Sequence, residues 1–156
     1  MKINIIVTGL FLVALVLISG CTKGTASPTN GAAVAGDKIT VFKSASCGCC
    51  EGYISELKKN GFSVETVIST DLTAIKVAHN IPSSMQSCHT AIIGDYFIEG
   101  HVPIEAVRKL LAEKPDVDGI ILPRMPSGSP GMPGEKTAPF EVYTLKDGVT
   151  SEYITI

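Results

Sequence analysis

Short apolar segments separated by polar turns run from residue 37 to the end of the chain and predict alternating strands and helices. Lys38–Lys43 is rich in β-branched residues, which favours a strand. A helix should follow from about Cys49 and end at Asn60-Gly61, a typical helix stop. Its inward face would carry Tyr53, Ile54 and Leu57. Ser63–Ile68 then predicts a second strand.

The pattern continues through a second helix and a hairpin. Asp71 is expected to cap this helix, and Pro82 closes it. Its apolar positions are Leu72, Ile75 and Ala78. Gly94-Asp95 is a two-residue hairpin turn that would join strands at Thr90–Ile93 and Tyr96–Glu99. The predicted order to this point is β-α-β-α-β-β.

The last part of the chain predicts a third helix, an irregular loop and a closing hairpin. Pro103 suits the first turn of the helix, and Pro115 lies beyond its end. The inward positions would be Ile104, Val107, Leu110 and Leu111. Pro123–Pro133, with the sequence PRMPSGSPGMP, is too rich in proline and glycine to pack as a core element. Glu141–Leu145 and Val149–Ile156 flank Asp147-Gly148 and predict the hairpin.

The first 20 residues have the pattern of a secretory signal. Lys2 gives a positive start, and Ile3–Ile18 is almost wholly apolar. Ile18-Ser19-Gly20-Cys21 resembles a bacterial lipobox, in which the cysteine is lipidated and becomes the mature N-terminus. We therefore expect an exported protein, anchored by a lipid on Cys21 to the periplasmic or extracytoplasmic side of a membrane. The alternative is an uncleaved membrane anchor with an incidental cysteine.

Composition divides the remainder into a tether and one domain. Residues 21–36 are small and polar without periodicity, which predicts a flexible tether. Residues 37–156 are enough for one domain with its own core. Without Lys2, 12 basic and 15 acidic side chains remain, for a net charge of −3. There is no basic run, so nucleic acid is not an expected partner.

Four cysteines of the domain carry the candidate chemistry. Cys47, Cys49 and Cys50 form a C-G-C-C cluster at the expected start of the first helix, and Cys88 precedes His89. Amides at a helix N-terminus favour a thiolate, which serves both as a redox nucleophile and as a ligand for a soft metal. The electrostatics alone therefore do not choose between thiol redox chemistry and metal binding.

The order of elements, with a cysteine pair between the first strand and the first helix, resembles the thioredoxin fold. The resemblance covers about Asp37–Lys114 and implies an α/β domain with a central mixed sheet flanked by helices. In that fold the third strand starts beside the end of the first, so Cys88 and His89 would lie next to the cysteine cluster. His101, just past the fourth strand, would reach the same edge. The cis-proline that thioredoxins carry before the third strand is missing here.

The third cysteine of the cluster favours copper over the alternatives. Cys47 and Cys50 alone would suffice for a thiol-disulfide oxidoreductase, and Cys49 would invite wrong disulfides. Adjacent Cys49 and Cys50 would be crowded on one zinc ion but suit thiolates that bridge several Cu(I) ions. Two structural disulfides, a zinc site and an oxidoreductase remain as alternatives. Met125 and Met132 could add thioether ligands from their loop, or could pin the loop to the surface.

Three motifs in order closely resemble the CopG-like family, formerly a domain of unknown function. They are SASCGCC, QSCHTAIIGDYFIEGHVP and RMPSGSPGMP. The resemblance implies a copper-resistance protein of the cell envelope with a thioredoxin-like fold, extended by the Met/Pro/Gly loop and the β-hairpin. It implies a multinuclear, cysteine-bridged copper site whose ligands are Cys47, Cys49, Cys50 and Cys88. Further candidates are His89, His101, Met125 and Met132. The expected partners are copper ions and a copper exporter or carrier protein.

Overall fold

The computed structural model describes residues 37–156, and its framework is one seven-stranded sheet. The strands are β1 (Lys38–Lys43), β2 (Ser63–Ile68), β3 (His89–Ile93), β4 (Tyr96–Glu99), β5 (Gly119–Ile121), β6 (Glu141–Lys146) and β7 (Val149–Thr155). They lie side by side in the order β2-β1-β3-β4-β5-β6-β7. The helices are α1 (Gly48–Lys59), α2 (Leu72–Ala78) and α3 (Ile104–Glu113), with a short 3-10 turn at Ser83–Met85.

Strand directions confirm the predicted thioredoxin-like arrangement. β1 runs parallel to β2 and antiparallel to β3, and β3 runs antiparallel to β4. Lys43 at the end of β1 pairs with His89 at the start of β3. The sheet thus brings the residue before β3, Cys88, to the end of β1 from which α1 departs. Strand β5, which the sequence did not predict, joins β4 in parallel and connects the fold to the hairpin β6–β7.

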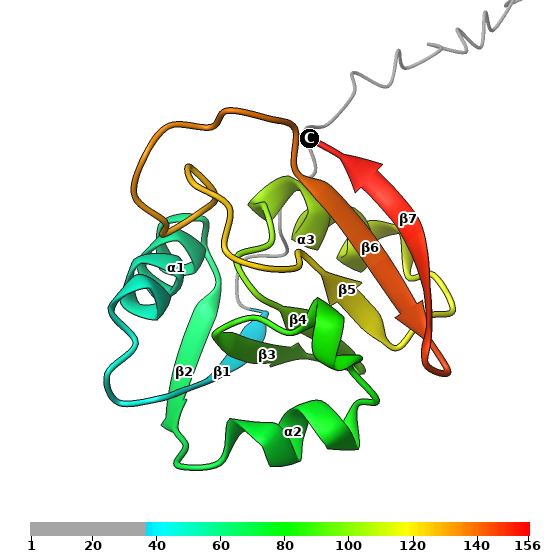
Figure 1. The fold of residues 1–156 in the computed structure, drawn as a ribbon, viewed down its shortest axis with the longest axis horizontal. Helices are drawn as coiled ribbons and strands as arrows, with labels where there is room; N and C mark the ends of the chain where they lie inside the picture. The colour runs from blue at the N-terminus through cyan, green and yellow to red at the C-terminus, as the bar shows by residue number, and fades with distance from the viewer. Residues whose placement is uncertain (1–36) are drawn as a thin grey trace, which may run out of the picture.

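Helices cover both faces of the sheet (Figure 1). The larger core lies under α1 and α3, where Tyr53, Leu57 and Leu110 are fully buried against the strands. A smaller core on the α2 side is built from Ile81, Phe97, Ile121 and Leu145. Alternation along the strands explains the division, because successive side chains of one strand point to opposite faces.

The N-terminus of α2 is capped by a side chain, whereas that of α1, where the cysteines lie, is not. Asp71 caps α2 as predicted, since its carboxylate accepts hydrogen bonds from the backbone N–H groups of Thr73 and Ala74. Cys47 occupies the equivalent position of α1 and makes no capping hydrogen bond through its side chain. The first amides of α1 therefore remain available to a neighbouring negative charge.

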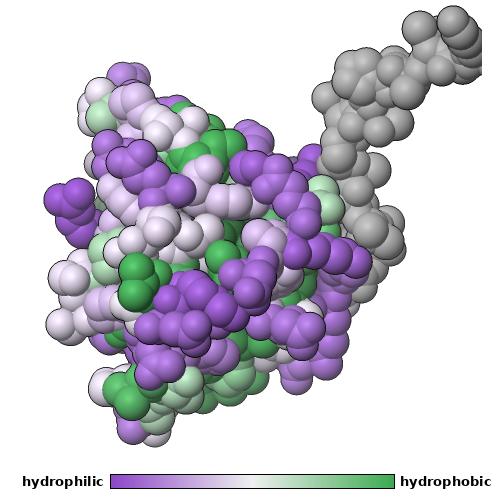
Figure 2. Space-filling model, turned by 90° about the vertical axis from the view of Figure 1, so that its right-hand side faces the viewer, coloured by the Kyte–Doolittle hydropathy of each residue, from purple (hydrophilic) through white to green (hydrophobic). Residues whose placement is uncertain are grey.

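The loop between β5 and β6 leaves the sheet, passes over α1 and returns to the hairpin (Figure 1). On the side of the molecule where β6 and β7 lie, hydrophilic residues cover much of the surface and hydrophobic ones form small separate areas (Figure 2). None of the described helices is both long and apolar enough to span a membrane. The predicted signal segment, the tether and Cys21 lie outside the described residues.

Candidate metal centre

The sulfur atoms of four cysteines, from two segments far apart in the chain, lie close together. Cys47 precedes the first residue of α1, and Cys49 and Cys50 lie in its first turn. Cys88 lies immediately before β3. The pairing of β1 with β3 places this position beside the start of α1, as the sequence predicted.

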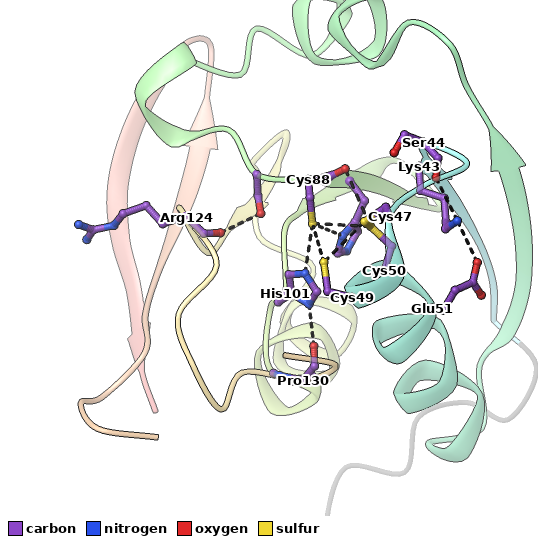
Figure 3. Close-up of a disulfide and its surroundings, with 12 residues drawn as sticks. Lys43, Ser44, Cys47, Cys49, Cys50, Glu51, Cys88, His101, Arg124 and Pro130 are labelled. Atoms are coloured by element: carbon purple, nitrogen blue, oxygen red, sulfur yellow. Dashed lines mark hydrogen bonds and ion pairs between the residues drawn. A yellow bond between two sulfur atoms is a disulfide. The ribbon is translucent and has the colours of Figure 1, made fainter. Parts of the chain in front are cut away.

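The four sulfur atoms all lie within 4.8 Å of one another, a spacing that permits shared metal coordination. Cys47 and Cys50 form a disulfide, whereas Cys49 and Cys88 are free thiols. The Sγ atom of Cys88 is 3.6 Å from that of Cys50 and 3.8 Å from that of Cys49. Cys88 thus contacts two of the other three sulfur atoms (Figure 3), as does Cys49, whose Sγ atom is also 3.6 Å from that of Cys47.

Two buried histidines complete the surroundings of Cys88. Its Sγ atom is 3.3 Å from Nδ1 of His89 and 3.2 Å from Nε2 of His101. Both imidazoles are fully buried, and their ring centroids are 4.8 Å apart. The predicted position of His101 at the cysteine edge is confirmed, and the sulfur and the two nitrogens form a second potential metal-binding group.

Hydrogen bonds and burial set the protonation of these groups. The Nδ1–H of His101 donates to the Pro130 carbonyl at 2.8 Å, which leaves Nε2 with a lone pair directed at Cys88. Burial lowers the pKa of His101, and it lowers the pKa of His89 to about 3. Burial, reinforced by Cys49, raises the pKa of the Cys88 thiol to about 12. Without metal, the site thus holds neutral imidazoles and a protonated thiol at pH 7.

The loop between β5 and β6 forms one wall of the site through its backbone. Ser87 Oγ donates to the Arg124 carbonyl at 2.8 Å, and the Pro130 carbonyl orients His101. Gly131 has a φ of 80° and lies directly on Gly52 of α1, because a Cβ atom at Gly52 would be 2.7 Å from the Gly131 oxygen. Only glycine at both positions allows this crossing of two backbones.

The two loop methionines occupy different places. Met125 is 47% exposed and lies in the wall of a hollow of about 540 Å³ formed with residues 137–141 and Tyr143. Met132 is half-buried and follows Gly131 at the crossing over α1. Their roles as thioether ligands stay predictions.

Residues that the sequence analysis did not assign also shape the site. Tyr53 is fully buried, with its ring 4.7 Å from that of His89 and 5.6 Å from that of His101, centroid to centroid. Lys43 is 2% exposed and pairs with Glu51 at 2.9 Å, next to the cysteines. The burial of Lys43 could have been predicted from the alternation along β1, which places this residue on the same inward face as Ile39 and Val41.

Comparison with known proteins agrees with this geometry. Residues 85–132 match the family described as "Protein of unknown function, DUF411". Two solved structures, forms 2 and 1 of "Copper resistance protein copG", are each 39% identical to the chain, with TM-scores of 0.72 and 0.71. The alignments cover 77% of this chain and 98% and 97% of the solved chains. The chain belongs to the CopG-like copper-resistance family. No curated protein matches it.

The part of this CopG-like chain that matches the DUF411 family carries one half of the site. The matched residues 85–132 include Cys88, both site histidines and the loop that crosses α1. The C-G-C-C cluster lies before the matched residues, within the thioredoxin-like part of the fold. The candidate site is therefore formed by residues from the matched segment and by the cysteines at the N-terminus of α1.

Replacement of Gly131 by alanine should loosen the loop that orients His101. A Cβ atom at this position would lie 2.2 Å from the backbone nitrogen of Tyr53, so either the loop or α1 must move. Gly134→Ala is the matched control, since Gly134 has a φ of 90° and its Cβ atom would meet only Ser127, at 3.2 Å. We expect Gly131→Ala to lower the free energy of unfolding by about 1–3 kcal/mol more than Gly134→Ala in urea denaturation. Equal losses would contradict the backbone crossing.

The stability of the metal-free protein should fall as the pH decreases below about 6.5. The unfolded chain binds protons at its histidines near pH 6.5, whereas burial keeps the folded pKa of His89 at about 3. The unfolded state therefore gains protons first, and one such histidine costs up to about 1.4 kcal/mol per pH unit within that window. Urea denaturation between pH 7 and 5 measures the slope. His89→Gln should make it shallower, and an unchanged slope in that variant would contradict a buried neutral His89.

Proposed function

We propose that this protein binds Cu(I) in the cell envelope through the thiolates of Cys47, Cys49, Cys50 and Cys88, and serves copper resistance or copper handling. The observation that carries the proposal is the convergence of four sulfur atoms within 4.8 Å. The choice of metal is supported by the two related solved structures, which are copper-resistance proteins. Copper here is the cargo of the protein.

The spacing of the sulfurs suits shared metal ions. With metal–sulfur bonds of about 2.3 Å, two sulfurs on one tetrahedral ion lie about 3.8 Å apart. The non-bonded Sγ distances from Cys88 to Cys49 and Cys50 are 3.8 and 3.6 Å. Because Cys88 has both neighbours at this distance, its thiolate can bridge two ions. We therefore propose a multinuclear site rather than a single ion.

Soft thiolates and the local electrostatics favour Cu(I) as the ion. Cu(I) is selected by thiolate and thioether ligands. The uncapped amides of α1 stabilise negative charge on the cysteines of its first turn. The Nε2 lone pair of His101 offers a nitrogen ligand beside Cys88, and we propose His89, Met125 and Met132 as further donors. Each thiol loses its proton on metal binding, so copper uptake releases protons.

The full site requires reduction of the Cys47–Cys50 disulfide. Two electrons and two protons convert this disulfide into two thiols, and the number of free cysteines in the cluster then rises from two to four. Only the reduced form can bind copper through all four thiolates.

The disulfide also supports a second candidate function, a thiol-disulfide or copper oxidoreductase that uses Cys47 and Cys50. In a thiol-disulfide enzyme, Cys47 and Cys50 would exchange electrons with a substrate, and Cys49 would be dispensable. Copper binding requires Cys49 and Cys88 as much as Cys47. Variants of Cys49 therefore separate the two functions.

We further propose that a lipid on Cys21 anchors the protein to the extracytoplasmic side of a membrane, where it would exchange copper with an exporter or a carrier protein. The proposal rests on the lipobox-like sequence that ends the apolar leader. We expect intact-mass analysis of the membrane fraction to show a diacylated N-terminal cysteine, and Cys21→Ser to abolish that mass. An unmodified Cys21 in an uncleaved chain would refute the anchor.

The copper proposal predicts more than one tightly held Cu(I) per chain. The experiment is an anaerobic titration of the reduced protein against a chromophoric Cu(I) chelator, with metal counted per chain. Cys49→Ser and Cys88→Ser should each lower the stoichiometry, because each removes a bridging thiolate. Cys21→Ser is the matched control and should retain full binding.

The oxidoreductase makes the opposite prediction for the same variants. If the reduced protein fails to compete with the chelator, and Cys49→Ser still cycles the Cys47–Cys50 disulfide at the wild-type rate, the copper proposal is wrong. Equal copper loss in Cys21→Ser and Cys49→Ser would also contradict a site built on the four domain cysteines.

A further inference from the structure

A buried polar network lies on the α2 face of the sheet, and the proposed function does not use it. Its centre is Glu99, the last residue of β4, which is fully buried. Thr90 lies opposite Glu99 in the β3–β4 register and is also fully buried. Lys76 reaches them from α2 and is only 5% exposed. The three side chains face away from the core under α1 and α3.

The Glu99 carboxylate accepts hydrogen bonds from α2, from β3 and from the segment that precedes β3. Its Oε1 atom accepts from Lys76 Nζ at 2.5 Å and from the backbone N–H of Ser87 at 2.6 Å. Its Oε2 atom accepts from the Thr90 hydroxyl at 2.6 Å. A buried ion pair contributes little net stability compared with apolar residues of the same size. Stability alone is therefore a weak reason for this arrangement.

The bond to Ser87 connects the network to the metal centre. Ser87 directly precedes Cys88, and its hydroxyl also donates to the Arg124 carbonyl. On the other side of Cys88, His89 is fixed in β3 and its carbonyl accepts from the N–H of Gly100 at 3.1 Å. The residues on both sides of Cys88, Ser87 and His89, are therefore fixed by hydrogen bonds. Glu99 lies beside both the Cys88 segment and the Gly100-His101 segment.

We propose that Glu99 is a positioning residue for the Cys88 thiol. By accepting the Ser87 N–H, its carboxylate fixes the backbone that keeps the Cys88 sulfur in contact with Cys49, Cys50 and His101 at 3.2–3.8 Å. The consequence for copper rests on the proposed function, but the placement of the thiol exists without metal. The two are therefore separable by experiment.

A pair of double variants isolates the hydrogen bond from the buried charge. Lys76→Met/Glu99→Gln removes the ion pair but keeps an amide oxygen for the Ser87 N–H. Lys76→Met/Glu99→Leu removes the ion pair and the acceptor. The primary readout is the alkylation rate of Cys88 by iodoacetamide in the metal-free disulfide form, quantified at Cys88 by peptide mass spectrometry. The second readout is Cu(I) affinity of the reduced chain, measured by chelator competition.

We expect the Gln variant to resemble the wild type in both readouts. In the Leu variant, Cys88 should be alkylated about tenfold faster, because the Cys88 segment moves more freely when the Ser87 N–H has lost its acceptor. Its Cu(I) affinity should fall about tenfold or more, as when an outer-shell partner of a metal ligand is lost. Equal alkylation rates in the two double variants would overturn the positioning role. A split in alkylation with no copper binding by the wild type would uphold the positioning role and refute the copper function.

A second pair applies if the Leu variant fails to fold. Ser87→Pro removes the donor N–H itself, and Ser87→Ala removes only the hydroxyl. Gln86 has φ −72° and ψ 149°, a conformation that suits the residue before a proline. We expect Cys88 to alkylate about tenfold faster in Ser87→Pro than in Ser87→Ala. Equal rates in this pair would overturn the proposal.

Discussion

The antiparallel pairing of β1 with β3 brings the four cysteines of the domain together. It sets Lys43 opposite His89, so the residue before β3 lies beside the N-terminus of α1. A shift of the register by one residue would turn His89 to the other face and move Cys88 away from the cluster. The backbone ladder therefore determines whether the fourth sulfur meets the other three.

Burial determines the protonation states of the side chains at this site. The imidazoles stay neutral and the Cys88 thiol stays protonated, because burial removes the hydration that would stabilise the charged forms of these groups. A protonated thiol can donate a hydrogen bond to a neutral imidazole, and it can become a metal ligand once its proton is lost.

Long-range polar contacts then fix the details. The loop after β5 crosses α1 at two glycines and presents the Pro130 carbonyl to His101. On the opposite face, Glu99 holds the Ser87 N–H. The segment carrying the Cys88 sulfur is consequently supported from both faces of the sheet, by elements that are absent from the C-G-C-C motif itself.

Most helices and strands, and the grouping of three cysteines at the start of α1, could be predicted from the sequence, because periodicity, turn residues and helix caps are local properties. It also predicted that Cys88 and His89 would lie beside the cluster, given the thioredoxin-like order. It missed β5, whose three residues are too few to show an alternation. The Cys47–Cys50 disulfide, the contact of His101 with Cys88 and the burial of Glu99 become visible only in the folded chain. These features depend on distances between side chains from different elements, and a linear pattern does not contain those distances.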